Sequence, residues 1–234
     1  KSVKKSNITN VEVDLSNGGI SKLLVDNENL ISEIAPYDFM QFIYSKGISP
    51  MQFYSPTNIK VLEDRNNKDE KMTRISFDLL GFEHIQVSYT WKKNTNRIVV
   101  HVEADKIEEL EKESLHIAFP FKESNWKLNY GAENHSLVYP VDQLPGSNKE
   151  FICVSEQVEL SDEKHKLILQ APAFSLFEVG SIIQEEKVNG AKVWTRENAA
   201  VNPLYLYVLN NYWHTNYKAS QSGHLSFDVS LEIE

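Results

Sequence analysis

The sequence predicts an all-β protein, built as a large antiparallel β-sandwich. Three observations support this prediction. Apolar and polar residues alternate in about a dozen short segments, which is the pattern of a half-buried strand. No segment has the strong periodicity of an amphipathic helix, and no repeat of roughly 20 to 50 residues indicates a propeller or a solenoid. A chain of 234 residues is long enough for one large sandwich, so we expect a single domain over residues 1–234.

The first strands are expected at residues 11–15 and 20–25, as a hairpin. Ser16-Asn17-Gly18-Gly19 lies between them, and Asn and Gly tolerate the positive φ that tight hairpin turns require. Residues 32–57 are irregular but rich in aromatic side chains, which indicates a long packed excursion. Further strands are predicted at 58–63, 73–80, 84–91 and 97–104, the later ones as an antiparallel meander, with the charged residues 64–71 as a solvated turn.

The second half continues the strand pattern. Residues 107–113 are acidic and too short for a helix, and 115–121 form a strand in which Pro120 indicates an edge position or a bulge. We expect short strands at 125–130 and 133–138, a turn-forming loop at 140–148, a hairpin of 151–160 with 166–170, and further strands at 176–183, 191–194, 204–209 and 224–233.

Composition excludes several classes of protein. Lys and Arg number 24 against 33 Asp and Glu, for a formal charge of -9, and no basic run could displace counterions from nucleic acid. No apolar run approaches the roughly 20 residues that span a bilayer. We therefore expect neither nucleic acid nor a membrane as a partner.

The single cysteine, Cys153, excludes an intrachain disulfide framework and a thiolate-rich zinc site. It lies in the apolar run 151–154, so we expect it to be a buried, unreactive side chain. The chain begins at Lys1 rather than Met, which suggests a piece of a longer protein or a processed product. Its location is left open between the cytoplasm and an exported compartment.

Residues 203–217, PLYLYVLNNYWHTNY, hold the densest group of aromatic and amide side chains. The alternation of residues 204–209 predicts a largely buried strand, with Pro203 at its start. The polar and aromatic residues that follow suit either a structural corner or contact with a sugar or another domain, because indole and phenol rings bury C–H surface while amides hydrogen-bond hydroxyls.

Catalytic motifs are hard to find. The seven histidines show no close metal-binding spacing, and neither a phosphate loop nor a Gly-x-Ser-x-Gly elbow is present. His101 and His116 fall on strands that we expect to be adjacent, and with Glu156 they could transfer protons at an anomeric centre. The alternative is that both histidines are structural. A glycosidase carboxylate pair cannot be located, because its separation is a distance in space.

Three segments in fixed order resemble the C-terminal β-domain of family-38 glycoside hydrolases, the α-mannosidases. The segments are Asn17-Gly18-Gly19-Ile20-Ser21-Lys22-Leu23, then Ala118-Phe119-Pro120-Phe121 with Asp142-Gln143-Leu144-Pro145-Gly146-Ser147, and finally 210–217 with Ala219-Ser220-Gln221. One departure is that the chain reads Ser155-Glu156-Gln157-Val158 where relatives commonly show an Arg-Trp pair. The resemblance covers most of the chain.

The resemblance implies a galactose-mutarotase-like β-supersandwich that follows a catalytic domain in a longer polypeptide. In that family the aspartate nucleophile and the zinc belong to the upstream domain, so this chain is expected to carry no catalytic residue, metal or cofactor of its own, with zinc in the catalytic domain. The expected partners are that domain and a mannoside. The candidate contact residues for the sugar or the domain interface are Asp142, Gln143, Asn210, Asn211, Tyr212, Trp213 and His214.

Two alternatives remain open. The first is an independent carbohydrate-binding module that uses Asn210, Asn211, Tyr212, Trp213 and His214. The second is an aldose 1-epimerase, which rests on the implied fold and on the scattered histidines. We also expect the loop 142–147 to lie at the rim that faces the catalytic domain, near residues 210–217, because two prolines stiffen it.

Overall fold

The computed structural model describes residues 6–48, 51–93, 95–132, 135–182, 201–212 and 217–234. In these residues the regular elements are strands, and no helix is present. The all-β prediction is therefore confirmed. The strands are β1 (Ile8–Val13), β2 (Ile20–Val25), β3 (Glu28–Asn29), β4 (Phe42–Lys46), β5 (Gln52–Tyr54), β6 (Thr57–Asn66), β7 (Glu70–Asp78), β8 (Phe82–Lys92), β9 (Arg97–Lys106), β10 (Glu113–Phe119), β11 (Lys127–Ala132), β12 (His135–Val138), β13 (Phe151–Cys153), β14 (Val158–Ser161), β15 (Lys166–Gln170), β16 (Leu176–Val179), β17 (Leu204–Asn210) and β18 (Gly223–Ile233).

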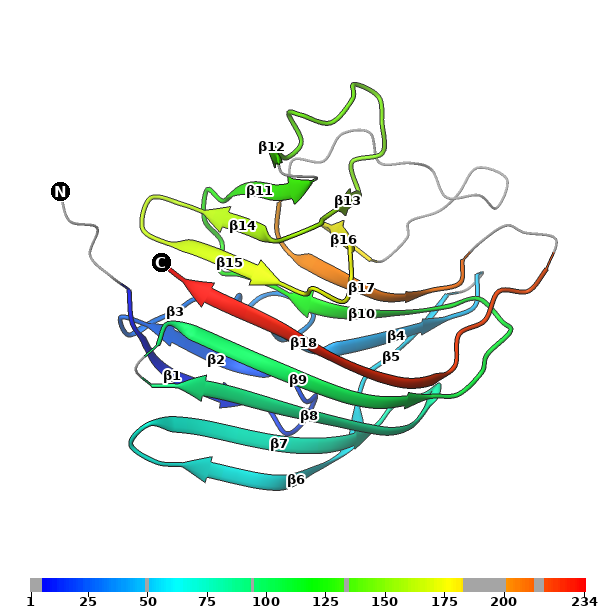
Figure 1. The fold of residues 1–234 in the computed structure, drawn as a ribbon, viewed down its shortest axis with the longest axis horizontal. Helices are drawn as coiled ribbons and strands as arrows, with labels where there is room; N and C mark the ends of the chain where they lie inside the picture. The colour runs from blue at the N-terminus through cyan, green and yellow to red at the C-terminus, as the bar shows by residue number, and fades with distance from the viewer. Residues whose placement is uncertain (1–5, 49–50, 94, 133–134, 183–200, 213–216) are drawn as a thin grey trace.

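Two large antiparallel sheets form the sandwich (Figure 1). The nine-stranded sheet has the order β12-β11-β14-β15-β18-β9-β8-β7-β6, and the six-stranded sheet has the order β13-β16-β17-β10-β4-β5. The short sheet β1-β2-β3 is bridged to the segments beside β4 and β10 of the six-stranded sheet, at Ile20–Phe39 and Ile31–Phe121. The meander predicted for residues 73–104 is confirmed as β7-β8-β9, with β6 at the edge of the sheet.

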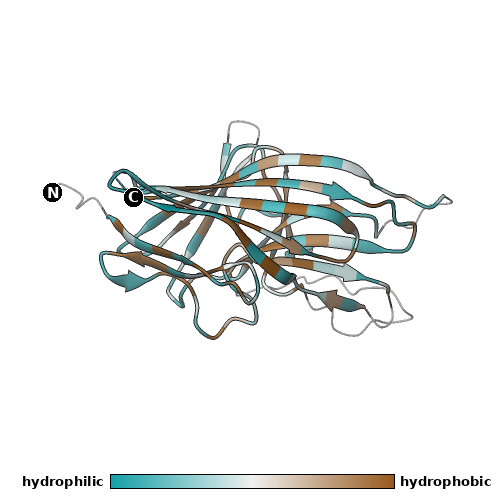
Figure 2. Cartoon of the chain, turned by 90° about the horizontal axis from the view of Figure 1, so that it is seen from below, coloured by the Kyte–Doolittle hydropathy of each residue, from teal (hydrophilic) through white to brown (hydrophobic). Residues whose placement is uncertain are grey.

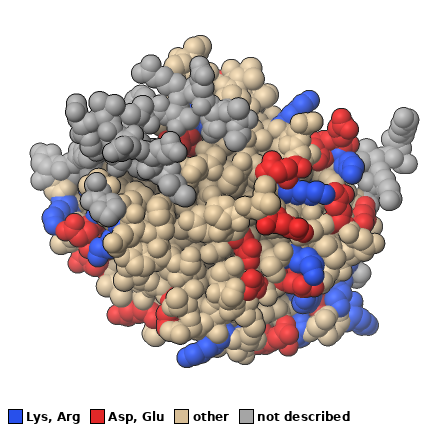
Figure 3. All heavy atoms as spheres, turned by 180° about the vertical axis from the view of Figure 1, so that it is seen from behind, with Lys and Arg blue, Asp and Glu red and all other residues tan. Residues whose placement is uncertain are grey.

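The alternation of apolar and polar residues explains why the nine-stranded sheet has one buried face and one exposed face. Along β9 the buried residues Ile98, Val100, Val102 and Ala104 alternate with partly exposed ones, so one face packs on the core and the other meets solvent. Figure 2 shows this banding of hydrophobic and hydrophilic residues along the long strands. On the far side of the molecule, seen from behind in Figure 3, the middle of the surface is largely free of charged side chains.

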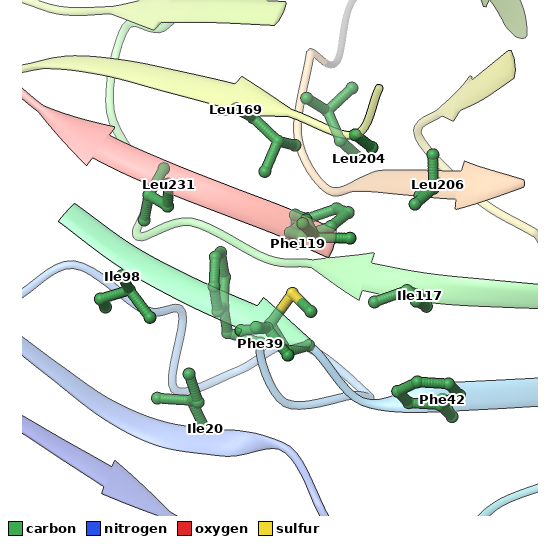
Figure 4. Close-up of a cluster of buried hydrophobic side chains, with 14 of the residues drawn as sticks. Ile20, Phe39, Phe42, Ile98, Ile117, Phe119, Leu169, Leu204, Leu206 and Leu231 are labelled. Atoms are coloured by element: carbon green, nitrogen blue, oxygen red, sulfur yellow. The ribbon is translucent and has the colours of Figure 1, made fainter. Parts of the chain in front are cut away.

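The core lies between the two large sheets. Figure 4 shows Phe119 of β10, Leu204 and Leu206 of β17 and Leu231 of β18 in one cluster of buried side chains, and each is at most 2 % exposed. Phe39 packs edge-on against Phe119, with ring centroids 5.3 Å apart. Burial of such side chains stabilises a fold by roughly 1.5–3 kcal/mol each before the entropy cost.

The first predicted hairpin is confirmed. β1 pairs with β2, and Gly18 has a φ of 78°, which is a conformation that favours glycine. Gly19 lies close to the chain that crosses beside it: a Cβ at this position would lie 2.8 Å from the Cβ of Asp38 and 3.0 Å from the carbonyl oxygen of Phe39. The Gly-Gly pair therefore serves both the turn and the Ile20–Phe39 bridge.

Several details of the prediction were wrong. β10 is a central strand that ends at Phe119, before Pro120, so Pro120 marks neither an edge nor a bulge; the bulge lies at Leu115/His116. Residues 151–160 do not form one strand, because β13 joins the six-stranded sheet and β14 joins the other. Most of the charged segment 64–71 belongs to β6 and β7. The expected strand at 191–194 lies outside the described residues.

Cys153 is exposed, contrary to the expectation that it is buried. Its strand, β13, is at an edge of the six-stranded sheet. Ile152 takes the inward position with 2 % exposure, and successive side chains of a strand point to opposite faces. The apolar run around Cys153 therefore did not determine its environment.

Candidate functional site

The corner at residues 210–212 is held by hydrogen bonds within the chain. Asn211 is 5 % exposed. Its Oδ1 accepts from the backbone N–H of Glu113 at 2.5 Å, and its Nδ2 donates to the carbonyl oxygens of Glu111 at 2.9 Å and Ala219 at 3.2 Å. This side chain ties the end of β17 to the segment that enters β10 and to the segment that leads to β18.

A buried ion pair lies beside this corner. Lys106 Nζ is 2.9 Å from Glu113 Oε1, and their side chains are 0 % and 2 % exposed. The Tyr44 hydroxyl donates to the other oxygen of the same carboxylate. Burial, with the hydrogen bond to Glu113, raises the pKa of Tyr44. Because all three groups are enclosed and satisfy one another, they hold β4, β9 and β10 together and offer nothing to a ligand.

Tyr212 belongs to the same corner. Its hydroxyl donates to the carbonyl oxygen of Gly47 at 2.8 Å, and its backbone N–H donates to Oδ1 of Asn210 at 3.0 Å. Trp213 and His214, the other two candidates of this segment, lie outside the described residues. The described part of the segment therefore acts as a structural corner.

The loop 139–149 has a rigid base and an exposed apolar tip. Asp142 turns its carboxylate back onto the N–H of Val138 at 2.8 Å, and Gln143 Nε2 donates to the carbonyl oxygen of Phe151 at 3.3 Å. Lys149 is buried and donates to the carbonyl oxygen of Leu144 at 2.8 Å. The polar pair that the sequence singled out thus stabilises the loop itself.

The apolar residues on either side of this polar pair were missed by the sequence analysis. Val141 and Leu144 of the loop are 76 % and 78 % exposed, and Val138, the last residue of β12, is 42 % exposed. We call these three side chains the apolar tip. Exposed aliphatic side chains this close in sequence, on a loop held by hydrogen bonds, are typical of a contact surface. The signal in the sequence was the placement of Val141 and Leu144 in a turn, where polar residues are the usual choice.

The loop and the corner contact different strands. The base of the loop bonds to β13 through Phe151, whereas Asn211 and Tyr212 bond to the residues around Glu113 and Gly47. The expectation that the loop 142–147 lies near residues 210–217 therefore remains a prediction.

A second polar group lies on the outer face of the six-stranded sheet. His116 Nε2 is 2.9 Å from Glu178 Oε2, and these side chains are 5 % and 3 % exposed. The ring of Tyr207 stacks on the imidazole at 4.2 Å between centroids, and Phe151 stacks on Tyr207 at 6.0 Å. Ser114 Oγ lies 3.4 Å from His116 Nδ1.

A histidine, a carboxylate and a serine could serve nucleophilic or acid–base chemistry. This arrangement is closed, however: Ser114 is 1 % and His116 is 4 % exposed, so a substrate cannot reach the reacting atoms. Burial, together with the charge of Glu178, raises the pKa of Tyr207. The group is best described as a buried polar network across the sheet.

The expected pairing of His101 with His116 is wrong, because the two lie in different sheets. His101 is on β9, where its Nδ1 is 2.8 Å from Asp228 and its Nε2 is 2.7 Å from Glu103. His224 Nε2 is 2.7 Å from the same Glu103 and its Nδ1 is 2.9 Å from Asp105. These five residues form an exposed ladder over β9 and β18. Glu156 is not among these partners.

Among the described residues, no group of three or more His, Cys, Asp or Glu side chains has the arrangement of a metal site. The same residues contain no helix that is long and apolar enough to cross a membrane.

Comparison with known proteins gives a fold. No protein-family model and no curated protein matches the sequence. An α-mannosidase from Enterococcus faecalis V583 superposes with a TM-score of 0.64 and 12% identity, over 96% of this chain and 28% of that chain. A glycosyl hydrolase family 38 protein from Enterococcus faecalis gives 0.65 and 11%, over 96% and 29%. A putative aldose 1-epimerase from Escherichia coli K12 gives 0.52 and 11%, over 96% and 95%.

The chain spans less than a third of the two Enterococcus structures and nearly all of the epimerase-type one. At these identities the likeness shows the fold alone. The chain has the galactose-mutarotase-like β-supersandwich fold, and the same fold occurs as one part of family-38 glycoside hydrolase structures.

Proposed function

We propose that this chain is the non-catalytic C-terminal β-domain of an α-mannosidase-like glycoside hydrolase, and that it packs against the catalytic domain of the same polypeptide. One observation carries the proposal. The chain superposes better on a fraction of two family-38 structures, with TM-scores of 0.64 and 0.65, than on a complete epimerase-type protein, with 0.52.

The chemistry of the described residues supports a packing role. The buried network of His116 and Glu178 is closed to substrate, and the amide of Asn211 is used by the backbone. The proposal therefore places the nucleophile and the zinc in the catalytic domain. Zinc there would act as a Lewis acid and orient the sugar; in this chain no described donor set fits it.

The apolar tip is the surface that we assign to the contact with the catalytic domain. Its base is fixed by Asp142 and Lys149, so docking would order few side chains and would lose little entropy. Val141 and Leu144 together offer an apolar centre of the kind that carries most of the binding energy of an interface.

The first test uses the chain alone. With an aryl α-mannoside and zinc we expect no turnover, since the catalytic groups belong to the other domain. Turnover that depends on a residue of this chain would contradict the proposal.

The second test uses the complete polypeptide. Val141→Asp with Leu144→Asp should disturb docking and lower mannosidase activity, while the isolated chain keeps its thermal midpoint. Leu15→Asp is the matched control, because Leu15 is also exposed, at 52 %, but lies in the β1–β2 turn. Equal activity of the two variants would show that the apolar tip makes no contact.

A further inference from the structure

A cleft of about 320 Å³ opens where the three sheets meet. Its lining comes from three separate places: Glu28 and Leu30 at β3, residues 122–126 between β10 and β11, and residues 162–165 in the β14–β15 turn. Ligand sites in proteins begin at roughly 300 Å³. We propose that this cleft binds a small, neutral, hydroxyl-rich ligand, namely a monosaccharide or a disaccharide. The proposal does not depend on the packing role.

The walls of the cleft are tied together before any ligand arrives. Glu28 lies 2.5 Å from Lys122 Nζ and 3.6 Å from Lys164 Nζ. Ser124 Oγ donates to Asp162 Oδ2 at 2.6 Å. Because these contacts join all three walls, the cleft is preformed, and a preformed site loses less entropy on binding.

One side of the cleft is apolar. The Trp126 indole N–H donates to the carbonyl oxygen of Lys122 at 2.7 Å, which fixes the ring, and Phe121 packs behind it at 6.1 Å between centroids. Leu30 lies beside it and is 2 % exposed. Trp126 is itself 7 % exposed, so a small part of this fixed indole is left to contact the C–H surface of a sugar ring.

The lining also carries one hydrogen-bonding nitrogen, on His165, that forms no hydrogen bond within the protein. The side chain of His165 is 10% exposed, and its Nδ1 is 3.6 Å from Asp162 Oδ1, beyond a hydrogen bond; this Nδ1 is buried and has no hydrogen-bond partner. Burial raises the pKa of Asp162, but hydrogen bonds from Ser124 and from the backbone of His165 lower it more, so the carboxylate is ionised.

Charge decides the class of ligand. The lining contains four carboxylates, of Glu28, Glu123, Asp162 and Glu163, but only two lysines, Lys122 and Lys164. The resulting negative field opposes phosphate and carboxylate ligands. Hydroxyl groups suit the site, because each can donate to a carboxylate and accept from a lysine or an imidazole.

The test is a titration of the 234-residue chain with methyl α-mannoside, galactose, glucose and a disaccharide of mannose, followed by saturation-transfer NMR of the ligand. Inorganic phosphate is the probe for the charge argument. We expect saturable binding of at least one sugar and none of phosphate. Absence of saturable sugar binding, or preferential binding of phosphate, would overturn the proposal.

Variants locate the binding. His165→Phe keeps a ring but removes the polar edge, and Lys164→Ala removes a side chain that is 70% exposed. Each should weaken sugar binding by about two- to tenfold, which is the net value of one hydrogen bond. Lys68→Ala, in the remote β6–β7 turn, is the control and should bind like the wild type. If His165→Phe lowers the thermal midpoint, its effect on binding is not specific, and the effect of Lys164→Ala on sugar binding becomes the test of the site. Binding that neither cleft variant weakens would refute the proposed site.

Discussion

Replacement of Asn211 by alanine should destabilise the fold strongly. The amide bonds three backbone groups at 2.5 to 3.2 Å, one of them the buried N–H of Glu113. Each buried group left without a partner costs about 1–3 kcal/mol, so we expect a loss of about 2–4 kcal/mol. For a domain of this size that lowers the thermal midpoint by about 5–15 °C.

The measurement is urea unfolding of the isolated chain, with thermal melting beside it. Tyr212→Phe is the matched variant at the same corner: it removes the hydrogen bond to Gly47 at 2.8 Å and the long one with Ser45 at 3.5 Å, and should cost only about 1 kcal/mol. The reasoning would be refuted if Asn211→Ala unfolded like the wild type while sugar binding changed, because Asn211 would then serve a ligand instead of the backbone.

Two further predictions concern the histidines. Glu178→Ala leaves His116 buried without its partner at 2.9 Å, so urea unfolding should show a loss of stability of about 3 kcal/mol. Because the network is closed, the wild-type chain should not accelerate galactose mutarotation. Acceleration that depends on His116 would contradict this. Hydrogen bonding to Asp228 raises the pKa of His101 above its ordinary 6.5, despite partial burial and with help from Glu103, so Asp228→Asn should lower that pKa in an NMR titration. Because the folded-state pKa is the higher one, the stabilisation is complete below the unfolded-state pKa and disappears as pH rises through the folded-state value; a His101 pKa unchanged in the variant would disprove the pairing.

Much of the fold was predictable because its strands are half-buried. β9 alternates between core and solvent, and β18 does so from Phe227 onward except at the buried Ser230; this period is visible in the sequence. β4 was missed for the opposite reason: Phe42, Ile43, Tyr44 and Ser45 are all buried, so no alternation marks the strand. β10 is buried along its whole length, and the sequence did not reveal that it is central.

The pairing of residues across the chain was not predictable. His116 meets Glu178 across 62 residues, and Asn211 meets Glu113 across 98. A sequence gives the chemistry of these side chains but not their neighbours, which depend on strand order and register. Hence His101 and His116 were expected to be adjacent, although they lie in different sheets.

An asparagine can serve a sugar or the backbone, and counting its hydrogen bonds separates the two roles. An amide side chain has two N–H donors and one oxygen that accepts two bonds. In Asn211 the nitrogen already donates to Glu111 and Ala219, and the oxygen accepts from Glu113. One acceptor position remains, on a residue that is 5 % exposed, which is too little for the recognition of a sugar hydroxyl. Val141 and Leu144 are the reverse case, because at 76 % and 78 % exposure they bury little surface within this chain. A surface of that kind is stabilised only when another surface covers it, which is why we assign the domain contact to the apolar tip.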